Sequence, residues 1–423
     1  MATGQGCSRL GIPIRDRCDS VDRLRVVQLP EPYPLGPYRY RAVVMPFGLY
    51  LHFPFCRNRC SYCDFYKELF DAGLEAQFYD ALRTETELCA EAHAGHDREI
   101  STIFIGGGTP SLTNLSLLAD WLTLVRTLFT VPAGIEFSIE TNPESVTLEN
   151  LTAFKQMGVN RPLFGIQSFN LALLKLLDRR HNPDDSYRAI YNANVLGFDN
   201  FGVDMIFGLP GQSMKMLSRD IDEFVDLNPP HISFYQLTVE HGTPLARKVE
   251  TGKLVMPNQE SSMAMYRGGI ERFTEAAYHR YEVSSLARPG FECRHNLGYW
   301  EGREYLGLGP SAHSFMQGKR FANLSSVRDY LASLKSGVRP IVYDESGIED
   351  RMVEAIMLGL RMARGIDRHQ FAARFGRSLE SRFDPHNYDL LRNSGHIVDE
   401  DGVVRLSDEG ILLADEITRR LLK

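Results

Sequence analysis

From Gly48 onward, apolar and polar positions follow two alternating rhythms. Short runs rich in β-branched and aromatic residues precede longer segments whose apolar residues recur every three or four positions, which is the pattern of a strand followed by an amphipathic helix. The strand-like runs end near His52, Ile105, Glu140, Gln167, Ile206 and Leu237. The helical segments are Leu74–Ala94, Ser116–Phe129, Thr147–Met157, Pro183–Leu196, Ser213–Asp226 and Ser261–Ala277.

Six strand–helix units in succession predict a parallel sheet, because parallel neighbours need a crossover connection. A closed eightfold barrel requires two further units. The pattern therefore predicts an α/β fold, a partial (β/α)6 TIM-like barrel over residues 45–280. Residues 281–345 contain strand-like Tyr281–Ser285 among Gly and Pro turns, and are expected to form a connecting region.

The C-terminal part has a different pattern, which predicts a small winged-helix-like domain over 346–423. Helices are expected first, then a strand pair and a closing helix: Ile348–Met362, Asp367–Phe375, Tyr388–Ser394, His396–Asp399, Val403–Leu406 and Asp408–Leu422. The net charge of −7 gives the chain no general attraction to nucleic acid. A packing domain or lid is therefore favoured over DNA binding.

The first 44 residues are rich in Arg and Pro and show no period. They are expected to be a disordered tail, or to result from a start codon chosen upstream of Met45. They lack the apolar segment of a signal peptide, and no apolar run approaches the roughly 20 residues of a membrane span. Hydrophobic residues form 43% of the chain and charged residues 24%, ordinary values for a globular protein. A cytoplasmic location is expected.

Three of the seven cysteines, Cys56, Cys60 and Cys63, lie in a C-x3-C-x2-C pattern directly after the first strand. An odd count with three so close is a poor disulfide framework and favours metal binding. Thiolates are the usual ligands of iron–sulfur clusters. Three thiolates leave one iron of a 4Fe–4S cluster open to chelation by the amine and carboxylate of S-adenosylmethionine (SAM). The alternative is structural zinc, for which His52 is the nearby candidate fourth ligand.

Other polar motifs fall where predicted strands end, which is where parallel α/β folds bind ligands. Glycines in Gly106-Gly-Gly-Thr-Pro110 let a ligand approach the backbone closely. Glu140, Gln167 and Asp204 offer carboxylates and an amide to the ribose or the methionine amine, and Arg179 offers a charge to the methionine carboxylate. Singly, each is also explained as a salt-bridge or cap residue; together, on successive strands, they describe one site.

These motifs resemble the oxygen-independent coproporphyrinogen III oxidase family of radical SAM proteins. The resemblance runs from about Gly48 to the C-terminus. It is carried by four segments: Tyr50–Cys56, Gly106–Ser111, Gly165–Phe169 and Asp204–Gln212. Carried over residue by residue, it implies SAM contacts at Tyr50, Gly107, Gly108, Thr109, Glu140, Gln167, Arg179 and Asp204. It also implies cluster ligands at Cys56, Cys60 and Cys63. Asp178 stands where the family has Gly before the arginine.

Two features separate the branches of this family. The true oxidase carries a further cysteine two residues after the third ligand, where this chain has Phe65. His295-Asn-Leu-Gly-Tyr-Trp300 resembles a signature of the haem chaperone branch. That resemblance implies haem as cargo held by His295, acceptor haemoproteins such as respiratory enzymes as partners, and an electron donor for the cluster.

Three alternatives remain open at this point. His295, Tyr299 and Trp300 are also explained as packing beneath the barrel mouth, although imidazole is a common axial ligand of haem iron. The chain is alternatively a coproporphyrinogen III dehydrogenase, or a radical SAM enzyme acting on another tetrapyrrole. Cys89 and Cys293 are expected to be packing residues.

Overall fold

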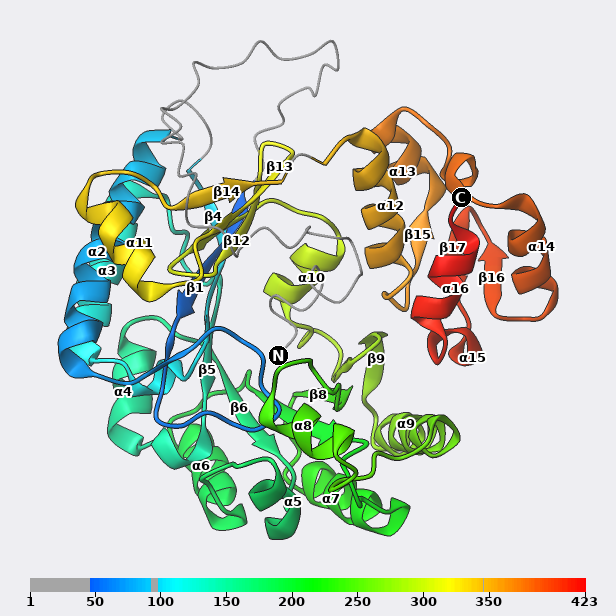
Figure 1. Cartoon of the computed structure of the whole chain (residues 1–423), viewed down its shortest axis with the longest axis horizontal. Helices are drawn as coiled ribbons and strands as arrows, with labels where there is room; N and C mark the ends of the chain where they lie inside the picture. Colours follow the sequence, from blue (N-terminus) through cyan, green and yellow to red (C-terminus); the bar gives the residue numbers. More distant parts are fainter. Residues whose placement is uncertain (1–45, 93–97, 345) are drawn as a thin grey trace.

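A twelve-stranded sheet forms the body of the computed structural model, which describes residues 46–92, 98–344 and 346–423 (Figure 1). The predicted N-terminal extension lies outside these residues. The strand order is β14-β13-β12-β11-β1-β4-β5-β6-β7-β8-β10-β9. The sheet curves into a partial barrel with helices on its outer side (Figure 1), so the predicted α/β fold is confirmed.

The six predicted strands are adjacent and parallel in the order of the sequence. They are β1 (Phe47–Phe53), β4 (Ile100–Gly107), β5 (Glu136–Thr141), β6 (Arg161–Gln167), β7 (Gly202–Phe207) and β8 (His231–Gln236). Nearly every residue in them is buried, as expected for parallel strands covered on both faces. Their carboxyl ends share one edge of the sheet, which brings the polar residues found there together.

The six predicted helices are present. Five connect successive parallel strands: α2 (Ala72–Ala92), α3 (Leu115–Leu128), α4 (Leu148–Gln156), α6 (Pro183–Val195) and α7 (Met214–Asp226). The sixth, α9 (Gln259–Glu275), follows β8 and leads to the next strand. Side chains cap their first turns; Asn114 accepts from the amides of Ser116 and Leu117, and Thr147 forms a capping box with Asn150. Between β6 and α9, two short helices were not predicted: α5 (Leu171–Leu176) and α8 (Pro244–Glu250).

Residues 281–345, expected to be a connecting region, supply strands to both ends of the main sheet. On the β8 side lie antiparallel β9 (His279–Glu282) and β10 (Ser285–Ala287). On the other side β11 (Tyr305–Leu308) runs parallel to β1 as a seventh parallel strand. It continues into antiparallel β12 (His313–Met316), β13 (Lys319–Asn323) and β14 (Ile341–Tyr343), with α11 (Val327–Lys335) between the last two. Strands of three to five residues are too short for a recognisable period.

Helix α10 (Arg294–Trp300) lies between the sheet and the C-terminal domain (Figure 1). That domain has its own apolar core, centred on Met352, Ile356, Phe371 and Val404. Its elements are α12 (Ile348–Gly359), β15 (Ile366–Asp367), α13 (Arg368–Phe375), α14 (Pro385–Asn393), β16 (Ile397–Glu400), β17 (Val403–Leu406), α15 (Asp408–Ile411) and α16 (Ala414–Leu421). The predicted closing helix is thus two helices separated at Leu412 and Leu413.

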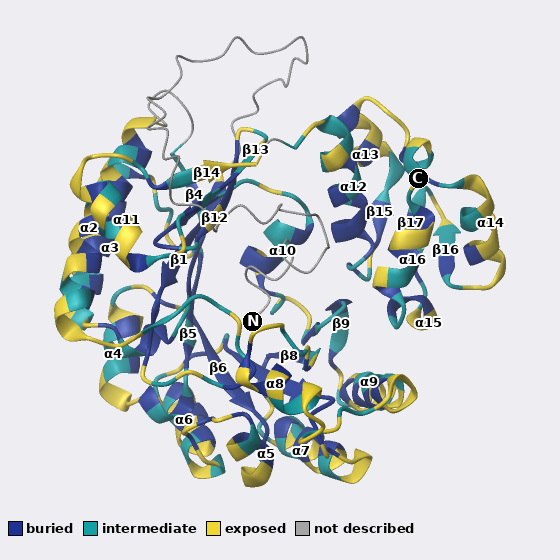
Figure 2. Cartoon of the chain, in the orientation of Figure 1, coloured by how far each residue is buried: buried dark blue, intermediate teal, exposed yellow. Residues whose placement is uncertain are grey.

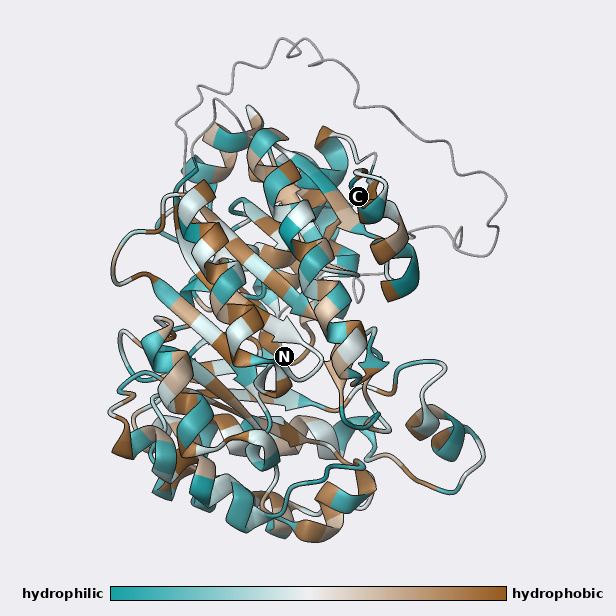
Figure 3. Ribbon diagram, turned by 90° about the vertical axis from the view of Figure 1, so that its left-hand side faces the viewer, coloured by the Kyte–Doolittle hydropathy of each residue, from teal (hydrophilic) through white to brown (hydrophobic). Residues whose placement is uncertain are grey.

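Burial follows the layers of the fold: strands are dark, and the outer faces of the helices are exposed (Figure 2). Seen from the side of α2, α3 and α11, hydrophilic and hydrophobic residues alternate along the covering helices (Figure 3). In the described ranges, no helix combines the length and the apolar composition needed to cross a bilayer.

Candidate metal and cofactor site

The three predicted ligand cysteines lie on a loop at the carboxyl edge of the sheet. The loop begins at β2 (Phe55–Cys56), which pairs with β3 (Glu68–Leu69) and so closes its base. Ser61 fixes the middle of the loop: its hydroxyl donates to the Leu176 carbonyl at 3.1 Å, and its own carbonyl accepts from the Leu245 amide at 2.9 Å. The short helices α5 and α8 therefore hold the loop against the barrel.

The thiol of Cys56 is buried, and those of Cys60 and Cys63 are half-buried. Burial raises the pKa of Cys56 to about 11, although the Thr109 hydroxyl, which donates to its sulfur at 3.5 Å, opposes the shift. Burial also raises the pKa of Cys63. A thiol in such surroundings holds its proton at neutral pH unless a bound metal cation takes the proton's place.

The donor set fits a 4Fe–4S cluster with one open iron better than structural zinc. A structural zinc site is closed and tetrahedral, so it needs a fourth ligand beside the three loop cysteines. Both ring nitrogens of His52 are engaged, Nδ1 with the Tyr50 hydroxyl at 3.1 Å and Nε2 with the Tyr66 carbonyl at 3.2 Å. The three loop thiols would hold three irons and leave the fourth open.

Two other described cysteines lie elsewhere, as expected of packing residues. Cys89 is buried on α2, and Cys293 donates from the N-terminus of α10 to Glu136 at 3.6 Å.

The glycine run passes directly over the cysteine loop. The Gly108 amide donates to the Phe53 carbonyl at 2.7 Å, and the Gly107 amide donates to a Glu140 carboxylate oxygen at 3.0 Å. Gly107 has a φ of +107°, a conformation that L side chains rarely adopt. A Cβ on Gly108 would lie 2.5 Å from the Phe55 carbonyl oxygen, so only glycine fits between β4 and the loop.

Gly108→Ala is expected to lower the free energy of unfolding of the apo-protein by about 1–3 kcal/mol, because the methyl group displaces backbone rather than a flexible side chain. Urea denaturation followed by circular dichroism measures it. Gly268→Ala on α9 is the matched control, since its methyl group would meet only the end of the Met214 side chain. Equal stability of Gly108→Ala and the parent would contradict the close contact.

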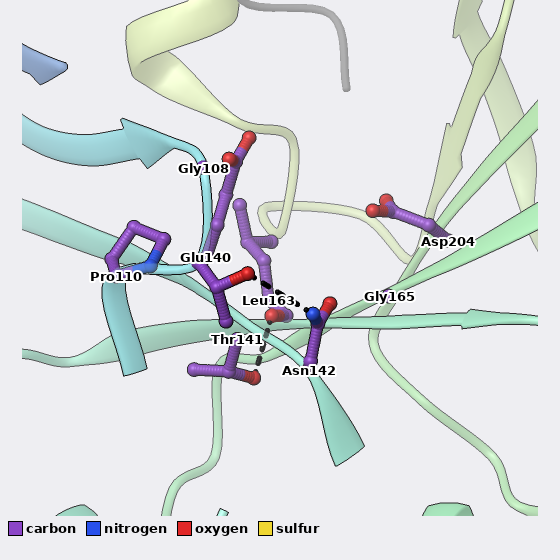
Figure 4. A pocket seen from close by; sticks show the side chains of 9 residues that line it. Gly108, Pro110, Glu140, Thr141, Asn142, Leu163, Gly165 and Asp204 are labelled. Carbon is purple, nitrogen blue, oxygen red and sulfur yellow. Dashed lines mark hydrogen bonds between the residues drawn. The ribbon is translucent and has the colours of Figure 1, made fainter. Parts of the chain in front are cut away.

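A small pocket opens beside the glycine run. Its walls are Gly108, Thr109, Pro110, Glu140, Thr141, Asn142, Leu163, Gly165 and Asp204. In Figure 4, Asp204 extends from β7 toward the side formed by Glu140 and Leu163. The pocket thus brings together Gly108, Thr109, Glu140 and Asp204, four of the residues predicted to contact SAM. Carboxylates such as those of Glu140 and Asp204 can accept hydrogen bonds from ribose hydroxyls and from an amine.

Asn142 was not predicted, although it follows Glu140 by two positions at the same strand end. Its side chain reaches two predicted residues. Its Nδ2 donates to Thr109 Oγ1 at 3.2 Å, and its Oδ1 accepts from Arg179 Nη2 at 2.8 Å.

The remaining predicted SAM contacts lie around the pocket rather than in its wall. Arg179 is buried; it donates to the Gly165 carbonyl at 2.6 Å and contacts Cys60 Sγ at 4.0 Å. Gln167 is fully buried and accepts from the Tyr235 hydroxyl at 2.9 Å, while its Nε2 has no hydrogen-bond partner. Tyr50 packs with Phe104 and Leu163 in a separate cluster. The guanidinium of Arg179 thus lies beside the sulfur of Cys60.

His295 lies inside the barrel, toward the opposite end of the strands. Its Nδ1 bonds Thr102 Oγ1 at 2.8 Å, near the start of β4, and its Nε2 bonds the Tyr299 hydroxyl at 2.8 Å. Glu136 caps the helix by accepting from the amides of Arg294 and His295, each at 2.9 Å. Burial lowers the pKa of His295 to about 3, so the ring is neutral at pH 7. The imidazole is enclosed and both its nitrogens are engaged, which is the packing arrangement considered above.

The end of α10 joins the barrel to the C-terminal domain. Trp300 packs against Leu358 and Met362. Arg374 donates to the carbonyls of Glu301 and Gly302, at 3.1 and 3.2 Å. Helix α10 is therefore held by the barrel at its first turn and by the C-terminal domain at its last turn.

Comparisons with known proteins agree with this fold. Residues 50–224 match the model of the radical SAM superfamily, and residues 349–413 match that of the HemN C-terminal domain. A solved structure of the coproporphyrinogen III oxidase HemN from Escherichia coli superposes with a TM-score of 0.76 over 89% of each chain, at 22% identity. The fold is therefore that of a radical SAM protein with a HemN-type C-terminal domain.

Curated relatives define the family more closely. The heme chaperone HemW of Bacillus subtilis is 33% identical over 370 residues, covering 87% of this chain and 97% of that protein. The heme chaperone HemW of Mycobacterium tuberculosis H37Rv is 37% identical over 385 residues, covering 89% of this chain and 95% of that protein. The chain belongs to the HemW family.

Proposed function

We propose that this protein is a haem chaperone, which binds haem and passes it to acceptor haemoproteins. The observation that carries the proposal is the identity of 33–37% over nearly the whole length of two bacterial heme chaperones. Phe65 supports it, because the true oxidase has a cysteine at that position. Respiratory enzymes as acceptors, an electron donor for the cluster and a cytoplasmic location remain predictions.

We propose His295 as the axial ligand of the haem iron. Its ring is neutral at pH 7, so a nitrogen lone pair is available for iron at that pH. The hydrogen bond between Nε2 and Tyr299 has to break first, and the ring has to leave its buried place. Haem binding on this proposal therefore includes an outward movement of α10.

We propose that the cysteine loop holds a 4Fe–4S cluster and that the adjoining pocket takes SAM. When bound, the cluster supplies an electron to SAM. The chain's own part is to bind and orient: Gly108 and Thr109 give close backbone approach, and Glu140 and Asp204 offer acceptors to the amine and ribose hydroxyls. Arg179 is the candidate partner for the carboxylate.

Haem titration after anaerobic reconstitution of the cluster tests the proposed function. A stoichiometric shift of the Soret band is expected, and His295→Ala is expected to weaken binding tenfold or more, since an axial ligand is lost. His386→Ala, an exposed histidine on α14, is the control and is expected to bind as the parent does. Tyr299→Phe frees Nε2 and is expected to bind haem at least as tightly as the parent.

Two results bear on the alternatives. If the parent binds no haem but converts coproporphyrinogen III to protoporphyrinogen IX with SAM and a reductant, the chaperone proposal is wrong and the dehydrogenase stands. If haem binds equally to the parent and to folded His295→Ala, the protein is still a haem binder, but His295 is not the ligand.

A further inference from the structure

A chain of side-chain contacts links the thiols of Cys56 and Cys60 through the pocket wall. Thr109 Oγ1 donates to Cys56 Sγ at 3.5 Å and accepts from Asn142 Nδ2 at 3.2 Å. Asn142 Oδ1 accepts from Arg179 Nη2 at 2.8 Å, and Arg179 Nη1 reaches Cys60 Sγ at 4.0 Å. Asn142 is the midpoint of this chain: it contacts both Thr109, which donates to the Cys56 sulfur, and Arg179, whose cation lies beside the Cys60 sulfur.

The backbone holds Asn142 firmly at this midpoint. Its amide donates to Ser111 Oγ at 3.3 Å, and its carbonyl accepts from the Ser145 amide at 2.9 Å. Pro143 follows and begins a short 3-10 turn. A primary amide offers a donor and an acceptor on one small planar group, which is what the two neighbours require.

The direction of these hydrogen bonds depends on the amide. A threonine hydroxyl has only one hydrogen to donate. The Thr109 hydroxyl donates it to Cys56, because the same oxygen accepts a hydrogen bond from the Asn142 side-chain amide. An aspartate at position 142 would accept that hydrogen instead and turn the hydroxyl away from the sulfur. It would also pair with Arg179 and compete with Cys60 for the cation.

Hydrogen bonds and positive charge at the ligand sulfurs stabilise the added electron of a reduced iron–sulfur cluster, so they raise its reduction potential. The effect is strong where the donors are buried, as Thr109 and Arg179 are. From this geometry we infer that Asn142 is a positioning residue that orients Thr109 toward Cys56 and Arg179 toward Cys60, and so sets the reduction potential of the cluster. The inference rests on the proposed cluster and not on haem binding.

A redox titration of the full chain tests the inference. Each variant is reconstituted anaerobically, its iron is counted, and the reduced cluster is followed by electron paramagnetic resonance without SAM. Asn142→Asp and Asn142→Ala are expected to shift the equilibrium toward the oxidised cluster tenfold or more, which is a potential about 59 mV lower for a one-electron couple. Asn142→Asp keeps the size of the side chain, so it remains informative if Asn142→Ala perturbs the loop.

Thr141→Val is the matched control. Thr141 lines the same pocket one position earlier, but its hydroxyl donates to the Leu163 carbonyl and contacts no cysteine. The reduction potential of the cluster in Thr141→Val is expected to equal that in the parent. Equal potentials in the parent and Asn142→Asp, at the same iron content, would overturn the inference. If Asn142→Asp lowers the potential but the parent binds no haem, the inference about Asn142 stands and the proposed haem chaperone function fails.

Discussion

Cys60→Ser is expected to remove essentially all cluster iron from the anaerobically reconstituted protein, from about four iron atoms per chain to near zero. Each of the three loop thiols would hold one iron, and a serine hydroxyl does not ionise at neutral pH to replace a thiolate. Cys60 is half-buried beside Arg179, so little packing is lost and the protein should stay folded. Iron analysis and the loss of the broad visible absorbance measure the effect.

Cys89→Ala separates this effect from the loss of any thiol. Cys89 is fully buried on α2, away from the cysteine loop, so this variant should retain the parental iron content. If Cys60→Ser retained four iron atoms, the assignment of Cys60 as a ligand would be wrong.

Glu85→Ala is expected to lower the free energy of unfolding by about 3–5 kcal/mol, because it leaves several buried donors without an acceptor. The Glu85 carboxylate on α2 accepts from the Tyr330 hydroxyl at 2.7 Å, from Asn323 Nδ2 at 2.6 Å and from the Gly309 amide at 2.9 Å. All three donors belong to the late segment around β11, β13 and α11. Glu85 therefore joins the first helix to the last strands of the sheet.

Denaturation of the apo-protein by urea measures this loss. Glu87→Ala is the control: its side chain lies on the exposed face of the same helix, and its removal should change stability by less than about 0.5 kcal/mol. A change for Glu85→Ala no larger than that for Glu87→Ala would contradict a structural role for the carboxylate.

The parallel core of the fold was predictable because each strand is a run of six to eight mostly buried residues followed by an amphipathic helix. The local periodicity of apolar residues was enough to predict these strands and helices. The cysteine loop was equally accessible, since its ligand spacing is local. Glu140 and Asp204 could be placed together because the carboxyl ends of parallel strands share one edge.

Features that depend on distant pairing were not accessible in this way. Strand β11 has four residues, and nothing in them specifies β1 as the partner. The sequence motif around His295 suggested a surface for haem, but it contains no sign that Thr102 and Tyr299 would occupy both ring nitrogens. The role of Asn142 likewise arises only when Thr109 and Arg179 are brought to it.

The pairing of β1 with β11 also has a consequence for synthesis. Gly48 pairs with Tyr305, so one edge of the first strand stays open while most of the chain is made. Phe47, Leu49 and Leu51 belong to β1, which is covered along this edge only after β11 has been synthesised and has paired with it. Unpaired apolar strand edges favour association between chains, and non-local pairing slows folding. A ribosome-bound chain halted before residue 305 should therefore be prone to aggregation. The completed and released chain should aggregate less, because β11 can then pair with β1.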